Sequence, residues 1–246
     1  MDDTLRARFC EGFYSSRPAG WIEKHPDNRL DESERVVADI AGCLSALASG
    51  QRDFSYPRHD QRVFELLQRI VPQRRLTRGA DIGCATGCFP AMQLAAGIER
   101  CTVFEVRPVE VNDDRVEVRV QDLTYAEDVE ADFDLVTCLS TIEHVGLGRY
   151  GDQLDPWGDI KMAANLRRIL RPGGVMLISF PIGPGCVVYD AHRIYSPERR
   201  SALFGDLTLV ARPRWTRHGQ WRGKLAVALR KAGAFWQPIY VLEKPR

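Results

Sequence analysis

The spacing of hydrophobic residues changes near residue 77. Before that point, apolar residues recur every three or four positions, which predicts one helix ending before Gly50 and a second over 60–71. After it, amphipathic segments with the period of helices occur at 89–97, 159–170 and 196–205. Short apolar runs alternate with them and indicate strands at 78–83, 101–106, 116–120, 133–140, 175–182, 207–211 and 239–243.

Capping residues mark several of the predicted helix ends. Asp31 stands three residues before Glu34, a capping-box spacing that starts the first helix. The motif RPGG, beginning at Arg171, is expected to end the helix before it. Strands that alternate with helices in this way predict an α/β fold with a mainly parallel sheet. We expect residues 1–72 to form an N-terminal helical cap and 73–246 to form the main domain.

Composition excludes several classes of protein. The net charge of +1 gives no global field that would attract nucleic acid or an anionic membrane. The seven cysteines are scattered singly, without the spacing of zinc ligands, so we expect reduced thiols in a cytoplasmic protein. The first residues contain no apolar run typical of a signal peptide, and we expect no membrane-spanning segment.

A glycine-rich turn follows the first predicted strand of the main domain. The stretch GADIGCATG places Asp81 before Gly83 and Gly87, in the pattern acid-x-Gly-x-x-x-Gly. Glycine lets the backbone approach a ligand closely, but many strand-to-helix turns contain two glycines without any ligand. In that alternative, Asp81 merely caps the turn.

Two further acidic residues stand at or just after the ends of the next two strands. Glu105 lies eighteen residues after Gly87, where the second strand of a doubly wound fold delivers a carboxylate to a ribose. Asp122 and Leu123 follow the third strand, where they suit the edge and the face of an adenine. Ligands of open α/β sheets bind at the carboxyl ends of the strands, and all three elements are predicted to lie there. The alternative for Glu105 is a solvated strand end.

With these motifs the chain resembles the class I S-adenosylmethionine-dependent methyltransferases, over about 79–181. The resemblance implies a Rossmann-like, seven-stranded, mainly parallel sheet with helices on both faces. It implies S-adenosylmethionine as the cofactor. The cofactor-binding residues it implies are Asp81, Gly83, Cys84, Gly87, Glu105, Asp122, Leu123, Leu139 and Ser140.

The stretch STIEHVGLGRYGD follows the fourth predicted strand and combines glycines with ionisable side chains. With the later motifs RPGGVMLISFPIG and YDAHRIY, it resembles a branch of methyltransferase-like proteins known as a domain of unknown function. That branch normally has Asn where this chain has Asp190. The resemblance supports the fold and names no substrate.

The same stretch is predicted to form the acceptor side of an active site. Candidate general bases are His144, His192 and Asp152, because a hydroxyl acceptor must lose a proton on methylation. Each histidine has a structural alternative, a pocket wall for His144 and a loop hydrogen bond for His192. Residues expected to bind substrate are Glu143, Arg149, Tyr150, Asp155, Arg193 and Tyr195. We expect O-methylation of a hydroxyl-rich small molecule, such as a sugar, a sugar nucleotide or a glycan precursor.

Three alternatives stay open. Ser140 stands where some methyltransferases have a metal-binding Glu, so we expect no metal. The segment 212–231 carries seven Arg or Lys residues and no acid, and Trp215 and Trp221 among them would suit RNA. A basic amphipathic helix packed on the sheet is the simpler interpretation, and we do not expect a nucleic-acid partner. A non-catalytic interaction module on the same fold is the third possibility. The sequence does not indicate an oligomeric state.

Overall fold

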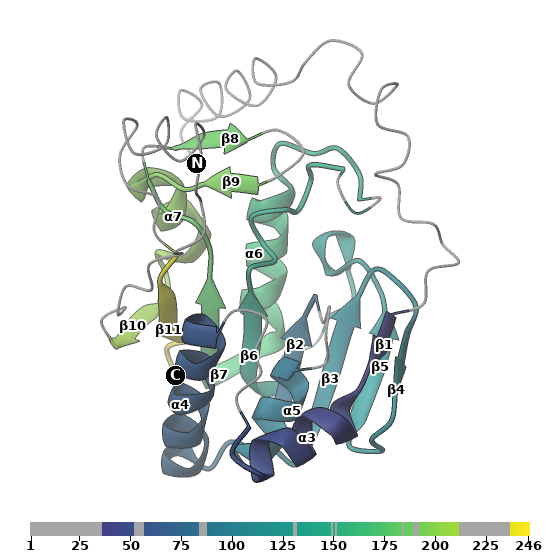
Figure 1. Cartoon of the computed structure of the whole chain (residues 1–246). Coiled ribbons are helices and arrows are strands. Elements are labelled where there is room, and N and C mark those ends of the chain that lie inside the picture. Colours follow the sequence, from purple (N-terminus) through teal and green to yellow (C-terminus); the bar gives the residue numbers. More distant parts are fainter. Residues whose placement is uncertain are drawn as a thin grey trace.

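A seven-stranded sheet forms the centre of the protein (Figure 1). The computed structural model describes residues 36–51, 57–83, 88–129, 132–148, 150, 152–183, 185–188, 192–211 and 237–246. In order across the sheet the strands are β10 (Thr208–Ala211), β11 (Ile239–Glu243), β7 (Leu170–Ser179), β6 (Phe133–Leu139), β2 (Arg78–Ile82), β3 (Arg100–Glu105) and β5 (Val116–Val120). Only β11 runs antiparallel to its neighbours. The predicted mainly parallel α/β sheet is confirmed.

The strand order reverses beside β2. This strand pairs in parallel with β3 on one side and with β6 on the other. From β2 the chain builds outward through β3 to β5, then crosses back to β6 and β7. In an open α/β sheet, a reversal of this kind marks the place at the carboxyl ends of the strands where ligands bind.

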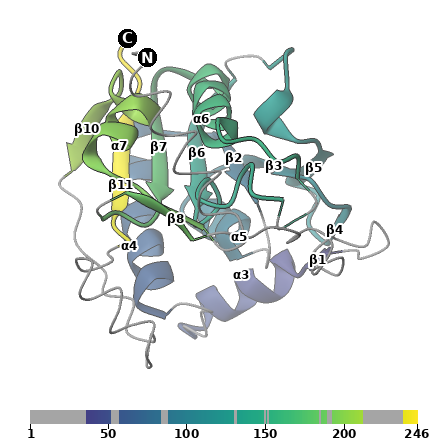
Figure 2. The ribbon, with the colours of Figure 1, turned by 90° about the horizontal axis from the view of Figure 1, so that it is seen from above.

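Helices cover both faces of the sheet (Figure 2). On one face lie α3 (Ile40–Ala48), α4 (Pro57–Arg74) and α5 (Cys88–Ala95). On the other lie η2 (Leu123–Tyr125), α6 (Gly158–Ile169) and α7 (Pro197–Phe204). Strand β7 shows the cause: Val175 and Leu177 pack toward α4, whereas Met176 and Ile178 pack toward α6. Successive side chains of a strand point to opposite faces, so an apolar run needs cover on both.

The first helix is shorter than predicted. Val36 and Val37 belong to strand β1 (Val36–Ala38), which pairs in parallel with β4 (Val109–Val111). β-branched residues favour this extended conformation, and the partner strand satisfies their backbone. The helix begins after Asp39, whose carboxylate accepts a hydrogen bond from the Gly42 amide at 2.9 Å. The predicted capping box lies outside the described residues.

The predicted helix end at RPGG is confirmed, but the strand after it begins earlier than predicted. Helix α6 does end just before it, but the motif belongs to β7, which begins at Leu170. Lys244 closes the helix end by donating from Nζ to the carbonyls of Arg167 and Leu170, both at 2.7 Å. Helix α4 packs directly on the sheet, and the proposed boundary at residue 72 stays a prediction. The basic segment 212–231 lies outside the described residues.

A short hairpin stands above the carboxyl edge of the sheet (Figure 1). Its strands are β8 (Cys186–Val188) and β9 (His192–Ile194), paired antiparallel. The Arg193 amide donates to the Glu143 carbonyl at 2.9 Å, which ties β9 to the loop after β6. The hairpin thereby brings the segment containing His192 to the same edge as the residues that follow β6.

Candidate active site

A cavity of about 200 Å³ opens at the carboxyl ends of β2, β3, β5 and β6. Each strand contributes residues at or just beyond its carboxyl end, and the parallel arrangement of the strands brings these residues together. The loop after β6 and helix α6 close the remaining side. The lining consists of Ile82, Gly83, Phe104, Glu105, Val106, Arg107, Gln121, Asp122, Leu123, Thr124, Ser140, Thr141, His144, Val145, Tyr150, Asp152 and Met162.

The cavity contains most of the predicted cofactor residues that the structure describes. Those lining it are Gly83, Glu105, Asp122, Leu123 and Ser140. Asp81 and Leu139 are buried at the ends of β2 and β6, beside the cavity and outside its lining. Cys84 and Gly87 lie outside the described residues. Five predicted residues from four separate strand ends thus line one cavity.

Glu105 presents a carboxylate that is already hydrogen-bonded. Its Oε1 accepts from the Val106 amide at 3.0 Å, and its Oε2 accepts from Arg107 Nη2 at 3.0 Å. The side chain is largely buried, so both the charge and its partner belong to the cavity wall. A ligand hydroxyl that approaches this carboxylate competes with Arg107 for its oxygen atoms.

Asp122 and Leu123 have different structural roles at the start of η2. The Asp122 carboxylate caps η2, accepting from the Thr124 amide at 2.8 Å. That cap fixes the start of the short helix and keeps Leu123 buried in the core. The cavity also has apolar lining residues from β2, β3, α6 and the loop after β6, which are Ile82, Phe104, Met162 and Val145. A flat apolar ring fits such a surface, with polar groups at its rim.

Asp81 lies 1% exposed beneath the glycine turn. Thr137 on β6 donates a hydrogen bond to its Oδ1. Burial raises the pKa of Asp81 to about 7, against the opposing effect of the Thr137 hydrogen bond. Within the described part of the chain, Oδ2 has no hydrogen-bond partner. An acceptor of this kind is ready to receive one more donor.

The turn after β6 fits closely against the turn after β2. Thr141 Oγ1 donates to the Ile82 carbonyl at 3.0 Å. A Cβ added to Gly83 would lie 2.7 Å from the Thr141 side chain, and Gly83 has a φ of +78°. Glycine is therefore required here, both for the conformation and for the space. Ser140 also has a left-handed φ, of +57°, and its amide donates to the Ser179 carbonyl at 3.1 Å.

Glu143 is a buried carboxyl group behind the cavity wall. Burial raises its pKa to about 8. Gln237, which precedes β11, donates from Nε2 to Glu143 Oε1 at 3.5 Å and also to Ser140 Oγ. His144 Nε2 lies 4.0 Å from the same Oε1. The carboxyl group thus lies between an amide donor and the imidazole that lines the cavity.

Three aromatic rings from the predicted acceptor side gather at the cavity mouth. The His144 ring centroid lies 5.6 Å from that of Tyr150 and 6.3 Å from that of His192, with both pairs edge-on. His144 and Tyr150 line the cavity; His192 reaches it through His144. The structure therefore brings both candidate histidines together, although 48 positions separate them in the chain.

Asp152 folds the glycine loop back on itself. Its Oδ2 accepts from the amides of Gly146 at 2.6 Å and Gly148 at 3.3 Å, and its Oδ1 accepts from the Tyr150 amide at 3.2 Å. The carboxylate lines the cavity while it holds this loop. Arg149 lies outside the described residues.

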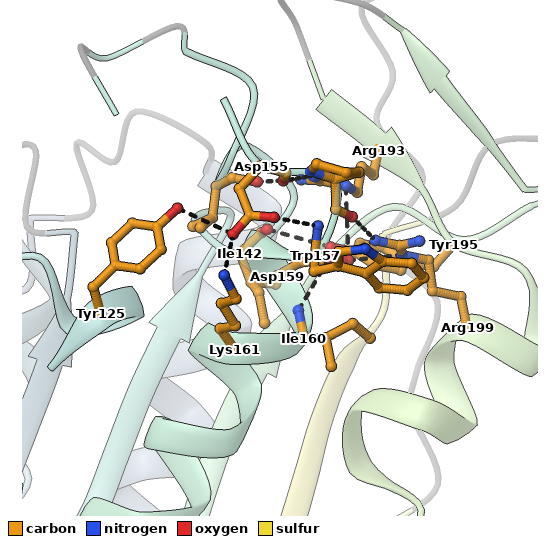
Figure 3. Close-up of polar contacts among 12 residues, drawn as sticks. Tyr125, Ile142, Asp155, Trp157, Asp159, Ile160, Lys161, Arg193, Tyr195 and Arg199 are labelled. Carbon is orange, nitrogen blue, oxygen red and sulfur yellow. Dashed lines mark hydrogen bonds and ion pairs between the residues drawn. The ribbon is translucent and has the colours of Figure 1, made fainter. Parts of the chain in front are cut away.

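The remaining predicted substrate residues lie in a polar network under the loop (Figure 3). Asp155 Oδ2 accepts from Lys161 Nζ at 2.7 Å and from the Tyr125 hydroxyl at 3.2 Å. Burial alone would raise the pKa of Asp155, but the hydrogen bond from Lys161 and its charge outweigh that effect and lower it. Tyr195 donates from its hydroxyl to the Ile142 carbonyl at 3.2 Å. Neither residue is part of the cavity lining.

Arg193 is almost completely buried in the same network. It donates to the carbonyls of Val145 and Asp155, and its Nε lies 3.7 Å from Asp159 Oδ2. Arg199 on α7 donates to the same carboxylate, from Nε at 2.8 Å. Burial would raise the pKa of Asp159, but the charges of Arg193 and Arg199 lower it. Arg193 therefore supports the loop from behind, where the sequence predicted a substrate ligand.

Several residues of the site were missed in the sequence. Arg107 follows Glu105 by two positions, a spacing that places both side chains on one side of a strand and was available as a signal. Gln237 gave no signal in the sequence, because it precedes the last strand and lies near Glu143 only as a result of the strand order in the sheet. Among the described residues, no group of three or more His, Cys, Asp or Glu is placed to hold a metal ion. No helix in the described ranges is long and apolar enough to cross a membrane.

The sheet order, the antiparallel β11 and a cavity at the reversal point define a class I methyltransferase fold. A methyltransferase from Burkholderia thailandensis, solved with 1,6-didemethyltoxoflavin and S-adenosylhomocysteine, matches with a TM-score of 0.54 and 19% identity, over 84% of this chain and 87% of that one. The N-methyltransferase NodS from Bradyrhizobium japonicum matches with a TM-score of 0.55 and 16% identity, over 79% and 99%. The [4+2]-cyclase SpnF matches equally well, at 0.55 and 16%, over 84% and 93%.

The family assignment comes from the sequence match. The chain belongs to the family described as "Caenorhabditis protein of unknown function, DUF268", which residues 77–220 match, more than half of its length. No curated protein sequence matches the chain. The matched range begins just before β2 and includes the cavity-lining loop after β6.

The buried cluster under the loop predicts a large loss of stability on neutralising Asp159. Asp159→Asn leaves Arg193 and Arg199 buried without a counter-charge, which should lower the free energy of unfolding by about 3–5 kcal/mol. The control is Asp206→Asn, which breaks the exposed pair with Arg167 and should cost at most about 1 kcal/mol. Urea denaturation measures both. Equal midpoints for the two variants would contradict this role of the cluster.

The raised pKa of Glu143 predicts a pH-dependent stability. The folded protein holds this proton more tightly than the unfolded chain does. The protonated Glu143 carboxyl group therefore makes its whole contribution to stability below about pH 4.5, and this contribution is lost as the pH rises through about 8. Between those values the wild type should lose at most about 1.4 kcal/mol per pH unit relative to Glu143→Gln. Asp81 titrates in both proteins, so the difference in stability between the wild type and Glu143→Gln isolates Glu143. Thermal stability measured against pH tests this, and parallel profiles for the two proteins would refute the raised pKa of Glu143.

Proposed function

We propose that the protein is an S-adenosylmethionine-dependent methyltransferase. The observation that carries this proposal is the shared cavity wall, on which Gly83, Glu105, Asp122 and Ser140 stand at four strand ends. The fold is that of solved methyltransferases, of which the Burkholderia thailandensis protein was crystallised with S-adenosylhomocysteine. The cyclase SpnF has the same fold, so the fold by itself does not select methyl transfer. The residues of the cavity have to support it.

These residues fit the proposed cofactor in three ways. The Glu105 carboxylate suits two ribose hydroxyls, which would take over positions that Arg107 donors now fill. The apolar surface around Leu123 suits the adenine ring, with Asp122 at its edge. Gly83 and Ser140 bring backbone close to the place where the methionine portion would extend, and buried Asp81 can accept a donor there. When bound, the cofactor supplies a methyl group on an activated sulfonium.

We assign the acceptor to the side of the cavity formed by the loop after β6. His144 lines this side and is the proposed general base, taking a proton from the acceptor hydroxyl. Glu143, whose Oε1 lies 4.0 Å from His144 Nε2, is the proposed group that orients the imidazole. His192 is the second candidate base. Asp152 is assigned to holding the loop, because three backbone amides already donate to its carboxylate.

The proposed acceptor is a hydroxyl-rich small molecule, such as a sugar, a sugar nucleotide or a glycan precursor. Its hydroxyls would face polar groups on the acceptor side, including Thr141, His144 and the half-exposed Tyr150. Removal of water and alignment of the acceptor with the methyl group supply most of the rate in such a displacement. Residues of the buried network, including Arg193 and Tyr195, act by fixing the loop that carries these groups.

The ribose assignment is tested through Glu105. Glu105→Ala should weaken S-adenosylmethionine binding at least about tenfold, because it removes two charge-assisted hydrogen bonds. Glu117→Ala is the matched control: Glu117 also pairs with the arginine two positions later, Arg119, but is exposed on β5, outside the cavity. Calorimetric titration measures both affinities. A folded wild type that binds no S-adenosylmethionine would overturn the enzymatic proposal in favour of an interaction module.

The role of His144 is tested by kinetics. His144→Ala should lower kcat at least about a hundredfold and leave cofactor affinity nearly unchanged. The wild-type rate should rise with pH through one ionisation, and that limb should be absent from the variant. The acceptor is found first by a methylation screen with labelled cofactor, read by mass. The control is His192→Ala, which alters the ring beside His144; if that variant alone loses activity, the base is His192.

A further inference from the structure

Two cysteine side chains meet between α3 and α5. Cys43 Sγ on α3 lies 3.3 Å from Cys88 Sγ, and Cys88 is the first residue of α5. Both residues are half-buried, so small oxidants reach them from solvent. In a disulfide the sulfurs are about 2.05 Å apart, so forming one requires the two sulfurs to move closer together.

Helix α3, which carries Cys43, is anchored to the rest of the protein at several points. Its apolar side packs against α5, where Ile40 is fully buried in a cluster with Ala91 and Leu94. Its first turn is bound to the segment after β4, because Asn112 donates to the Asp39 carboxylate at 2.8 Å and accepts from the Ala41 amide at 3.1 Å. The strand before it pairs with β4. The sulfur contact therefore joins two separately anchored elements.

The other described cysteines are placed differently. Cys138 is buried in the core, where burial raises the pKa of its thiol well above the usual value. Cys101 is also buried and lies 3.7 Å from the Gln93 side-chain oxygen. Cys186 is exposed on β8. Within the described ranges, Cys43 and Cys88 are the two cysteines with their sulfurs in contact.

We propose that Cys43 and Cys88 form a reversible disulfide that regulates the site. A hydroperoxide is the oxidant: one thiolate attacks its oxygen, giving a sulfenic acid and releasing hydroxide or alkoxide. The second thiolate then attacks the sulfenic sulfur, and the hydroxyl leaves as water after taking a proton. The two sulfurs lose two electrons in total, and the peroxide is reduced. A dithiol reductant reverses the reaction.

The disulfide ties the start of α5 to α3. Cys88 directly follows the predicted cofactor turn that begins at Gly83, so any displacement of Cys88 toward α3 is passed to that turn. The expected consequence is weaker binding of S-adenosylmethionine in the oxidised protein. This part rests on the proposed function, whereas formation of the disulfide does not.

Peptide mapping tests the chemistry on the full-length protein. After treatment with hydrogen peroxide, blocking of thiols and digestion with trypsin, the peptide 36–52 should be linked to the peptide 79–100. The link should disappear with dithiothreitol. Cys84 lies in the same tryptic peptide as Cys88, so Cys84→Ser must retain the link while Cys88→Ser must abolish it. A link that survives Cys88→Ser, or oxidation confined to the exposed Cys186, would overturn the proposal.

Calorimetry tests the consequence. Oxidised wild type should bind S-adenosylmethionine at least about fivefold more weakly than reduced wild type, with recovery on reduction. Cys43→Ser should bind equally in both states, and Cys186→Ser should behave like the wild type. If the disulfide-linked protein binds S-adenosylmethionine as tightly as the reduced protein does, the proposed regulation is refuted. If the reduced wild type does not bind S-adenosylmethionine at all, although oxidation still forms the link, the proposed cofactor is refuted instead.

Discussion

The parallel pairing of β2 with β3 and with β6 is the constraint from which the site follows. Asp81 stands opposite Val103 on one side and Thr137 on the other, so all three strands end at one edge of the sheet. The hydrogen bond from Thr137 to Asp81 is a direct result of that register. The chain continues from β2 and from β6 toward opposite halves of the sheet, and the cavity lies at the carboxyl ends of these two strands together with those of β3 and β5.

Buried charge stabilises the loop that closes the cavity. Asp152 gathers three amides of the loop, and beneath it Asp159 is paired with Arg193 and Arg199 from β9 and α7. Burying three charges is costly unless each has a partner, so this cluster tolerates few alternative arrangements. The cost is consistent with a structural task, namely to hold His144 and Tyr150 at the cavity mouth. The positions of His144 and Tyr150 at the cavity mouth thus depend on residues that do not line the cavity.

Much of the fold could be predicted because its cause is local. Apolar runs of β6 and β7 are buried on both faces, and the sequence showed that directly. Glu105, Asp122 and Ser140 could be placed because each lies at or just after the end of a strand, and strand ends are marked by a change of pattern. The first helix was mispredicted because pairing of Val36 and Val37 with β4 overrides local helical spacing. That pairing partner is some 70 residues away, beyond the reach of any local pattern.

The sequence by itself determined which residues are candidates for the chemistry, namely the acids at the ends of successive strands and the histidines near the glycine loop. Only the tertiary structure decided which of these face the cavity. Arg193 and Tyr195 belong to the motif YDAHRIY and were predicted to bind substrate, yet both side chains are buried beneath the loop. Gln237 joins Ser140 and Glu143 because β11 inserts next to β7. A side chain's direction depends on strand order and register, and these are set by contacts between segments that are distant in the chain.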